Sequence, residues 1–151
     1  MSTSQPKADL ATRRLRLPAS TEDLRALRHD LRTPINPILG YCELIEEEAG
    51  AAAPAALIAG LHELHVAGTR MLHLTNEIFS DKPSTLRGLD CAELQREFRA
   101  PAELAASLCR ELERQAIAAG LPVAAKDLRR IGIASGRWHA RIEEMLEQNC
   151  R

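Results

Sequence analysis

Apolar residues recur at alternating spacings of three and four along the stretch between residues 24 and 45. The series is Leu24, Leu27, Leu31, Ile35, Ile38, Cys42 and Ile45. This spacing places them on one face of an α-helix, which a globular protein buries against other helices. A comparable series follows over residues 57–78, and no segment alternates apolar and polar residues with the period of two that a half-buried strand requires. The sequence therefore predicts an all-α fold.

The composition agrees with this prediction and excludes some functions. Hydrophobic residues make up 45% of the chain, charged residues 27% and aromatic residues 3%. Ala, Leu, Glu and Arg are abundant, and they lose little conformational freedom in a helix. The net charge of -1 gives no reason to expect nucleic acid or a membrane surface as a partner. No apolar run follows the basic residues near the N-terminus, so we expect no signal peptide and a cytoplasmic location.

The cysteines and histidines give little sign of a metal site or a disulfide framework. The four cysteines lie far apart, at positions 42, 91, 109 and 150, without a CxxC pair. This spacing favours reduced, mostly buried thiols. His62 and His65 could suggest a metal site, but no acid or cysteine at ligand spacing completes it. We expect no metal and no cofactor in this chain.

Proline, glycine and serine divide the chain into segments. Residues 1–19 are polar and contain two prolines, which predicts a disordered tail. Residues 20–80 are predicted to form a helical hairpin, with a serine as the first N-cap. Residues 81–89 contain proline, serine and glycine and predict a linker. Residues 90–149 are predicted to form a second hairpin, whose turn is marked by a glycine followed by a proline.

Two of the predicted helices carry proline in their interior. Pro34 and Pro37 lie in the first helix, and Pro101 lies in the third. Proline lacks an amide hydrogen and its ring clashes with the preceding turn, so each helix should be kinked or interrupted there.

The chain also contains a weak internal repeat. A shift of 67 residues aligns the first hairpin with the second without a gap, and 13 of 57 positions are then identical. The prolines at positions 34 and 101 coincide, which favours a true repeat, although two amphipathic hairpins can also align by chance. The halves differ in their chemistry, because Arg96 stands where the first half has His29.

Residues 27–41, with the sequence Leu-Arg-His-Asp-Leu-Arg-Thr-Pro-Ile-Asn-Pro-Ile-Leu-Gly-Tyr, resemble the phospho-acceptor segment of sensor histidine kinases. The dimerisation and histidine-phosphotransfer domain of that family carries a near-identical His-Asp/Glu-Leu-Arg-Thr-Pro-Leu run. Residues 66–78 are similar to its second helix, and the resemblance extends beyond residue 80 only through the repeat. In the family, hairpins from two chains pair into a four-helix bundle. The resemblance thus implies a four-helix bundle of two tandem hairpins, an intramolecular pseudo-dimer of that domain.

The sequence also departs from the family. A sensor kinase would continue into an ATP-binding domain with an asparagine-bearing helix and a glycine-rich lid. Nothing after residue 80 resembles these, and the remaining 71 residues are too few to hold that domain. We therefore expect no ATP-dependent kinase activity. We also expect a monomer, although two chains could instead associate through their first hairpins.

The segment from His29 to Thr33 carries the expected chemistry. At 100° per residue, His29 lies on the helix face opposite the apolar series and should be exposed. A neutral imidazole can attack an aspartyl phosphate, with Mg²⁺ supplied by the partner's receiver domain. The resemblance implies that Asp30 orients or deprotonates the imidazole and that Thr33 helps to position water for dephosphorylation. Solvated side chains, and for Thr33 a threonine that merely precedes proline, remain the alternatives.

Other residues continue the face of His29 or lie on the facing helix. An apolar residue beside a glycine on an exposed face suits the docking of another protein. The expected docking residues are Arg32, Asn36, Leu39, Gly40, Glu43, Leu72 and Asn76.

The leading prediction is a histidine-containing phosphotransfer protein of two-component signalling. It would relay phosphoryl groups between receiver-domain aspartates through His29. Its partners would be response-regulator receiver domains or a hybrid histidine kinase. The alternative is a non-catalytic regulator or a phosphatase that binds a histidine kinase or a response regulator.

Overall fold

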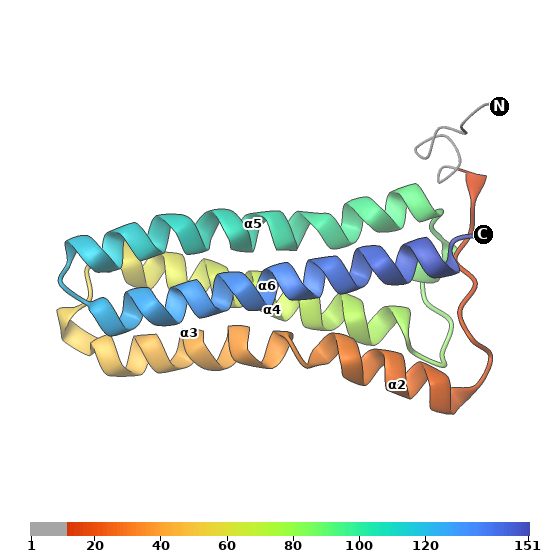
Figure 1. Cartoon of the computed structure of the whole chain (residues 1–151), viewed down its shortest axis with the longest axis horizontal. Helices are drawn as coiled ribbons and strands as arrows, with labels where there is room; N and C mark the ends of the chain where they lie inside the picture. Colours follow the sequence, from red (N-terminus) through yellow and green to blue (C-terminus); the bar gives the residue numbers. More distant parts are fainter. Residues whose placement is uncertain (1–11) are drawn as a thin grey trace.

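The computed structural model describes residues 12–151, and this part of the chain is a bundle of helices without a β-strand (Figure 1). Its helices are α2 (Thr21–Arg32), α3 (Ile35–Ala49), α4 (Ala55–Ile78), α5 (Cys91–Ala118) and α6 (Pro122–Asn149), with short 3₁₀ turns η1 (Gly50–Ala52) and η2 (Leu86–Gly88). The all-α prediction is confirmed. None of the helices in the described range is long and apolar enough to cross a membrane.

The helices pack as two antiparallel hairpins that form one four-helix bundle. Helices α2 and α3 follow one another along one edge of the bundle and lie beside both α4 and α6 (Figure 1). Helix α5 in turn lies beside α4 and α6, diagonally across from α3. Each hairpin therefore covers the apolar faces of the other, as the sequence predicted for two tandem hairpins in one chain.

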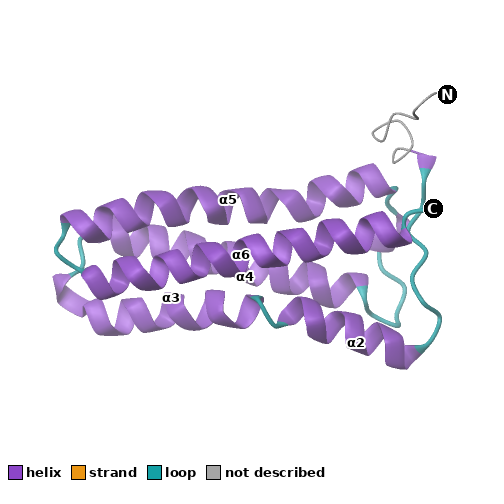
Figure 2. Cartoon of the chain, viewed as in Figure 1, coloured by secondary structure: helices purple, strands orange, loops and turns teal. Residues whose placement is uncertain are grey.

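The first edge of the bundle is broken where α2 meets α3 (Figure 2). Pro34 and Pro37 lack the amide hydrogens that would bond to carbonyls one turn earlier. Thr33 closes the end of α2 instead, because its amide donates to the His29 carbonyl at 3.1 Å and its hydroxyl donates to the same oxygen at 2.9 Å. The predicted kink is confirmed here. The interruption expected at Pro101 is absent, since α5 continues through this buried proline.

Trp138 of α6 lies fully buried at the centre of the bundle and joins three helices. Its indole Nε1–H donates to the hydroxyl oxygen of Thr75 on α4 at 3.1 Å. The Thr75 hydroxyl in turn donates to the Met71 carbonyl at 2.8 Å. The ring of Phe98 on α5 lies 5.8 Å from the Trp138 ring. This cluster satisfies every polar atom it buries, so it fixes how the two hairpins face each other.

The cysteines behave in two ways. Cys42 and Cys109 are buried in the core, and burial raises the pKa of each thiol to about 12. Cys91 and Cys150 form a disulfide with a Cα–Cα distance of 6.2 Å. The expectation of reduced thiols is therefore wrong for this pair. The two cysteines are 59 residues apart in the sequence, but they meet in the fold because α5 begins and α6 ends at the same end of the bundle.

An extended segment before α2 crosses the end of the bundle that carries the disulfide. The Arg13 carbonyl accepts from the Cys91 amide at 3.0 Å, and the Arg16 amide donates to the Asn149 carbonyl at 2.8 Å. The expected disordered tail covered residues 1–19. Residues 1–11 lie outside the described part of the chain, and disorder is wrong for the hydrogen-bonded residues 13–16.

Replacing Thr75 with valine should destabilise the bundle. The change keeps the volume but removes the acceptor for the buried Trp138 indole, so we expect the free energy of unfolding to fall by about 1–3 kcal/mol. Chemical denaturation monitored by circular dichroism measures this loss. Thr75→Ser keeps the hydroxyl and is the control; an unchanged stability in Thr75→Val would contradict the role given to this hydrogen bond.

Reducing the Cys91–Cys150 disulfide should also lower stability. Because the bond closes a long loop of the unfolded chain, its loss should cost about 2–4 kcal/mol. Thermal unfolding with and without dithiothreitol measures the effect. A variant with both cysteines changed to alanine should unfold at the lower temperature and ignore the reductant. If the native chain ignores it too, the disulfide does not form.

Candidate functional site

His29 lies in the last turn of α2 and is exposed. The opposite face of this helix packs Leu24 and Leu31 into the core. The apolar series therefore turns the imidazole outward, as expected. The side chain borders a shallow hollow whose other lining residues are Arg25, Arg28, Arg32, Thr33 and Asn36.

The hollow beside His29 is strongly cationic. Arg25, Arg28 and Arg32 line it, and in the described structure none of the three forms an ion pair with a carboxylate. Adjacent guanidinium groups without counter-charges create a positive potential that attracts anions. The hollow therefore suits an anionic group, such as a phosphoryl group or a carboxylate of another protein.

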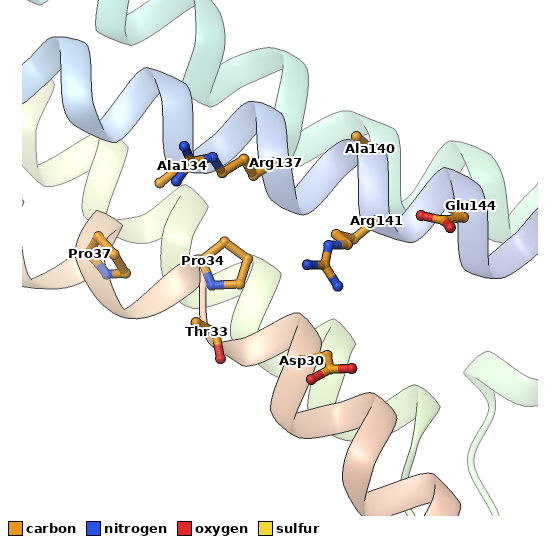
Figure 3. A pocket seen from close by; sticks show the side chains of 9 residues that line it. All are labelled: Asp30, Thr33, Pro34, Pro37, Ala134, Arg137, Ala140, Arg141 and Glu144. Atoms are coloured by element: carbon orange, nitrogen blue, oxygen red, sulfur yellow. The ribbon is translucent and has the colours of Figure 1, made fainter.

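A groove lies between the α2–α3 break and α6 (Figure 3). Its volume is about 580 Å³, and the residues that line it are Asp30, Thr33, Pro34, Pro37, Ala134, Arg137, Ala140, Arg141 and Glu144. Arg141 extends from α6 toward Asp30, and no ion pair between described residues closes the groove (Figure 3). Two of the predicted residues therefore line this groove. Asp30 directly follows His29 in the sequence, and Thr33 lies about one helical turn after His29.

Thr33 lies next to the histidine with a defined orientation. Its hydroxyl hydrogen is used in the bond to the His29 carbonyl, while the side chain remains exposed. Its oxygen can still accept a hydrogen bond. The geometry therefore allows Thr33 to hold a water molecule near His29, and it also explains the residue as a cap for the end of α2.

The predicted docking residues lie in two places. Arg32 and Asn36 line the hollow with His29, whereas Leu39, Gly40 and Glu43 follow farther along α3. Leu39 packs over Gly68 of α4, where an added Cβ would lie 2.9 Å from its Cδ2. Because Gly68 has no side chain, Leu39 can pack closely against α4. The predicted docking residues on α3 therefore lie beside α4.

The remaining two docking residues, Leu72 and Asn76, are half-buried on α4. The side-chain oxygen Oδ1 of Asn76 is buried and has no hydrogen-bond partner. An unpaired buried polar atom is costly, so such atoms are uncommon in folded proteins.

The second hairpin gives an internal comparison for this surface. Near Arg96, the residue at the position of His29, the carboxylate of Glu143 on α6 contacts two residues of α5. It accepts from Gln95 at 2.9 Å, lies 3.6 Å from the Arg99 guanidinium and bonds to the His139 ring at 3.2 Å. The repeat places a neutral residue, Asn76, at the position of Glu143.

The comparison holds on the other side as well. Glu97 of α5 pairs with Arg70 of α4 at 3.0 Å. The repeat matches these residues to Asp30 and Arg137, which line the open groove without forming an ion pair. Charged side chains therefore pair with one another around Arg96, whereas around His29 they remain unpaired and face solvent.

Four arginines at this site were not predicted from the sequence. Arg25 and Arg28 could have been found, because with Arg32 they recur at helical spacing on the face of His29. Arg137 and Arg141 lie more than one hundred residues away and reach the site only through the packing of α6 against α2 and α3. At the far end, His62 bonds to Glu46 at 2.9 Å, and the described residues contain no group of side chains able to hold a metal ion.

Comparisons with known proteins concern the first hairpin. Residues 21–84 match the family model of the His Kinase A (phospho-acceptor) domain. No characterised protein and no solved structure matches the chain. The match covers α2, α3 and α4, and hence the whole surface around His29 except for the α6 residues. The first hairpin is thus similar to the phospho-acceptor domains of two-component signalling, which carry a phosphorylatable histidine.

Proposed function

We propose that the chain is a histidine-containing phosphotransfer protein that relays phosphoryl groups between receiver-domain aspartates through His29. One observation carries this proposal: an exposed histidine in a segment similar to a phospho-acceptor domain lies among unpaired charged groups, while the corresponding groups in the second hairpin pair with one another. A surface that must receive another protein's active site needs such accessible groups.

The transfer requires only one nucleophile from this chain. A ring nitrogen of neutral His29 attacks the phosphorus of an aspartyl phosphate, and the P–O bond to the aspartate breaks. The aspartate leaves as a carboxylate, while the other ring nitrogen releases its proton to water or to Asp30. The second transfer reverses these events, with a new aspartate as the nucleophile. Mg²⁺ would be supplied by the receiver domain, because phosphoryl transfer depends mainly on positioning and electrostatics.

The neighbouring residues would assist in distinct ways. The arginines of the hollow stabilise the negative charge that the phosphoryl group brings to His29. Asp30 would stabilise the positive charge that the ring gains as one nitrogen attacks, until the other nitrogen releases its proton.

The second hairpin would serve as scaffold. We propose that it is a degenerate copy of the first, so that a single chain supplies the whole bundle and acts as a monomer in the cytoplasm. Helices α5 and α6 account for residues 91–149. In this proposal the phosphoryl donor is a partner's aspartyl phosphate.

The position of Thr33 favours a second candidate, a phosphatase or regulator acting on a response regulator. Its exposed hydroxyl oxygen lies in the groove one turn from His29. Under this alternative, His29→Gln should still accelerate loss of phosphate from a receiver domain, and Thr33→Val should not. Under the relay, His29→Gln should lose both transfer and any acceleration.

His29 should be the only residue that accepts the phosphoryl group. Incubating the chain with a receiver domain phosphorylated by acetyl phosphate, after removal of the free donor, should give an acid-labile label on the chain. His29→Gln should reduce this label at least a hundredfold, because no other nucleophile occupies the position. His73→Gln changes an exposed histidine outside the site and is the control; label that survives in His29→Gln would contradict the assignment.

A further inference from the structure

Resting on the proposed function, we infer that Arg28 and Arg32 bind an acidic side chain of the docked receiver domain. Asn76 is neutral and leaves room for that acidic side chain. In the second hairpin the chain's own Glu143 occupies the corresponding place. The first hairpin therefore accepts a partner, and the second does not.

The structure of the second hairpin shows how a carboxylate fills this position. Glu143 lies on α6 between two residues of α5, accepts a hydrogen bond from Gln95 and pairs with Arg99. The repeat matches Gln95 to Arg28 and Arg99 to Arg32. The first hairpin thus presents two cations where the second presents one cation and an amide.

The first hairpin lacks the matching acid. Asn76 has the position of Glu143 but no charge, and its buried Oδ1 has no hydrogen-bond partner. In the described structure neither Arg28 nor Arg32 forms an ion pair, and both line the hollow next to His29. The cationic half of an ion-pair network is therefore present, and among the described residues no acidic group stands at the matching position.

The chemistry of arginine indicates the missing group. A guanidinium offers a planar fork of donors that fits a carboxylate with two parallel hydrogen bonds. A carboxylate from the partner would sit where Glu143 sits in the second hairpin and would bring the partner's reactive aspartate toward His29. Charge pairs at the edge of an interface steer association and become weaker at high salt.

The direct test supplies the acid within the chain. Asn76→Glu should reproduce the Glu143 arrangement, pair with Arg28 and Arg32, and compete with the partner. The matched control is Asn76→Gln, which has the same length and shape as glutamate but no charge. Circular dichroism should show that both variants remain folded.

Binding is measured by calorimetry with purified, unphosphorylated receiver domains at low and high salt. We expect Asn76→Glu to bind about tenfold or more weakly than Asn76→Gln and to show a smaller salt dependence. The native chain should bind one receiver domain, because in the second hairpin Glu143 already pairs with Arg99. Equal binding by the two variants, or two receiver domains per chain, would overturn the inference.

The outcomes separate this inference from the proposed function. If receiver domains bind and Asn76→Glu does not weaken them, the relay stands and the acidic contact is wrong. If they bind as expected but never transfer a phosphoryl group to His29, the relay is wrong and the docking surface stands. If no receiver domain binds the native chain, both are wrong.

Discussion

The apolar face of the first hairpin must be covered by other helices, and in this chain the second hairpin covers it. The requirement follows from helices that each carry a broad apolar face. The buried hydrogen bond from Trp138 of the second hairpin to Thr75 of the first fixes how the hairpins meet. The Thr75 hydroxyl donates its own hydrogen to the Met71 carbonyl, so its oxygen accepts from the indole. With its bundle complete inside one chain, α2 is held at a fixed orientation, and that orientation turns His29 outward. The accessibility of the histidine thus depends on packing on the opposite side of its helix.

Much of the fold could be predicted because it follows local rules. Helical spacing of apolar residues located the helices of the first hairpin, and paired prolines located the break that separates α2 from α3. Pro101 shows the limit of such rules, since a single buried proline was tolerated inside α5. The disulfide and the hydrogen-bonded segment at residues 13–16 escaped prediction for another reason. Both depend on which chain ends converge in space, and residue spacing carries no information on that.

The candidate site divides in the same way. His29 and its neighbours on α2 could be found, because one helix presents them and a known motif contains them. The residues Arg137 and Arg141 could not, because they come from α6 and join the site only in the folded bundle. The most informative feature is the difference between the charged surroundings of His29 and of Arg96, which neither the motif nor the fold reveals alone. Matching the two hairpins position by position shows that ion pairs fill the surroundings of Arg96, whereas those of His29 contain unpaired cations and a neutral Asn76. Under the proposed function, that asymmetry separates the surface that docks a partner from the surface that does not.

The central claim is that His29 itself carries the phosphoryl group. The most direct measurement is phosphorus NMR of the native chain during incubation with a phosphorylated receiver domain, followed by mass spectrometry of its peptides under alkaline conditions. The account predicts a phosphohistidine signal that appears as the aspartyl phosphate disappears, and a phosphorylated peptide that contains residue 29. Loss of the aspartyl phosphate to free phosphate, with no phosphohistidine at any time, would contradict the relay and leave the phosphatase alternative.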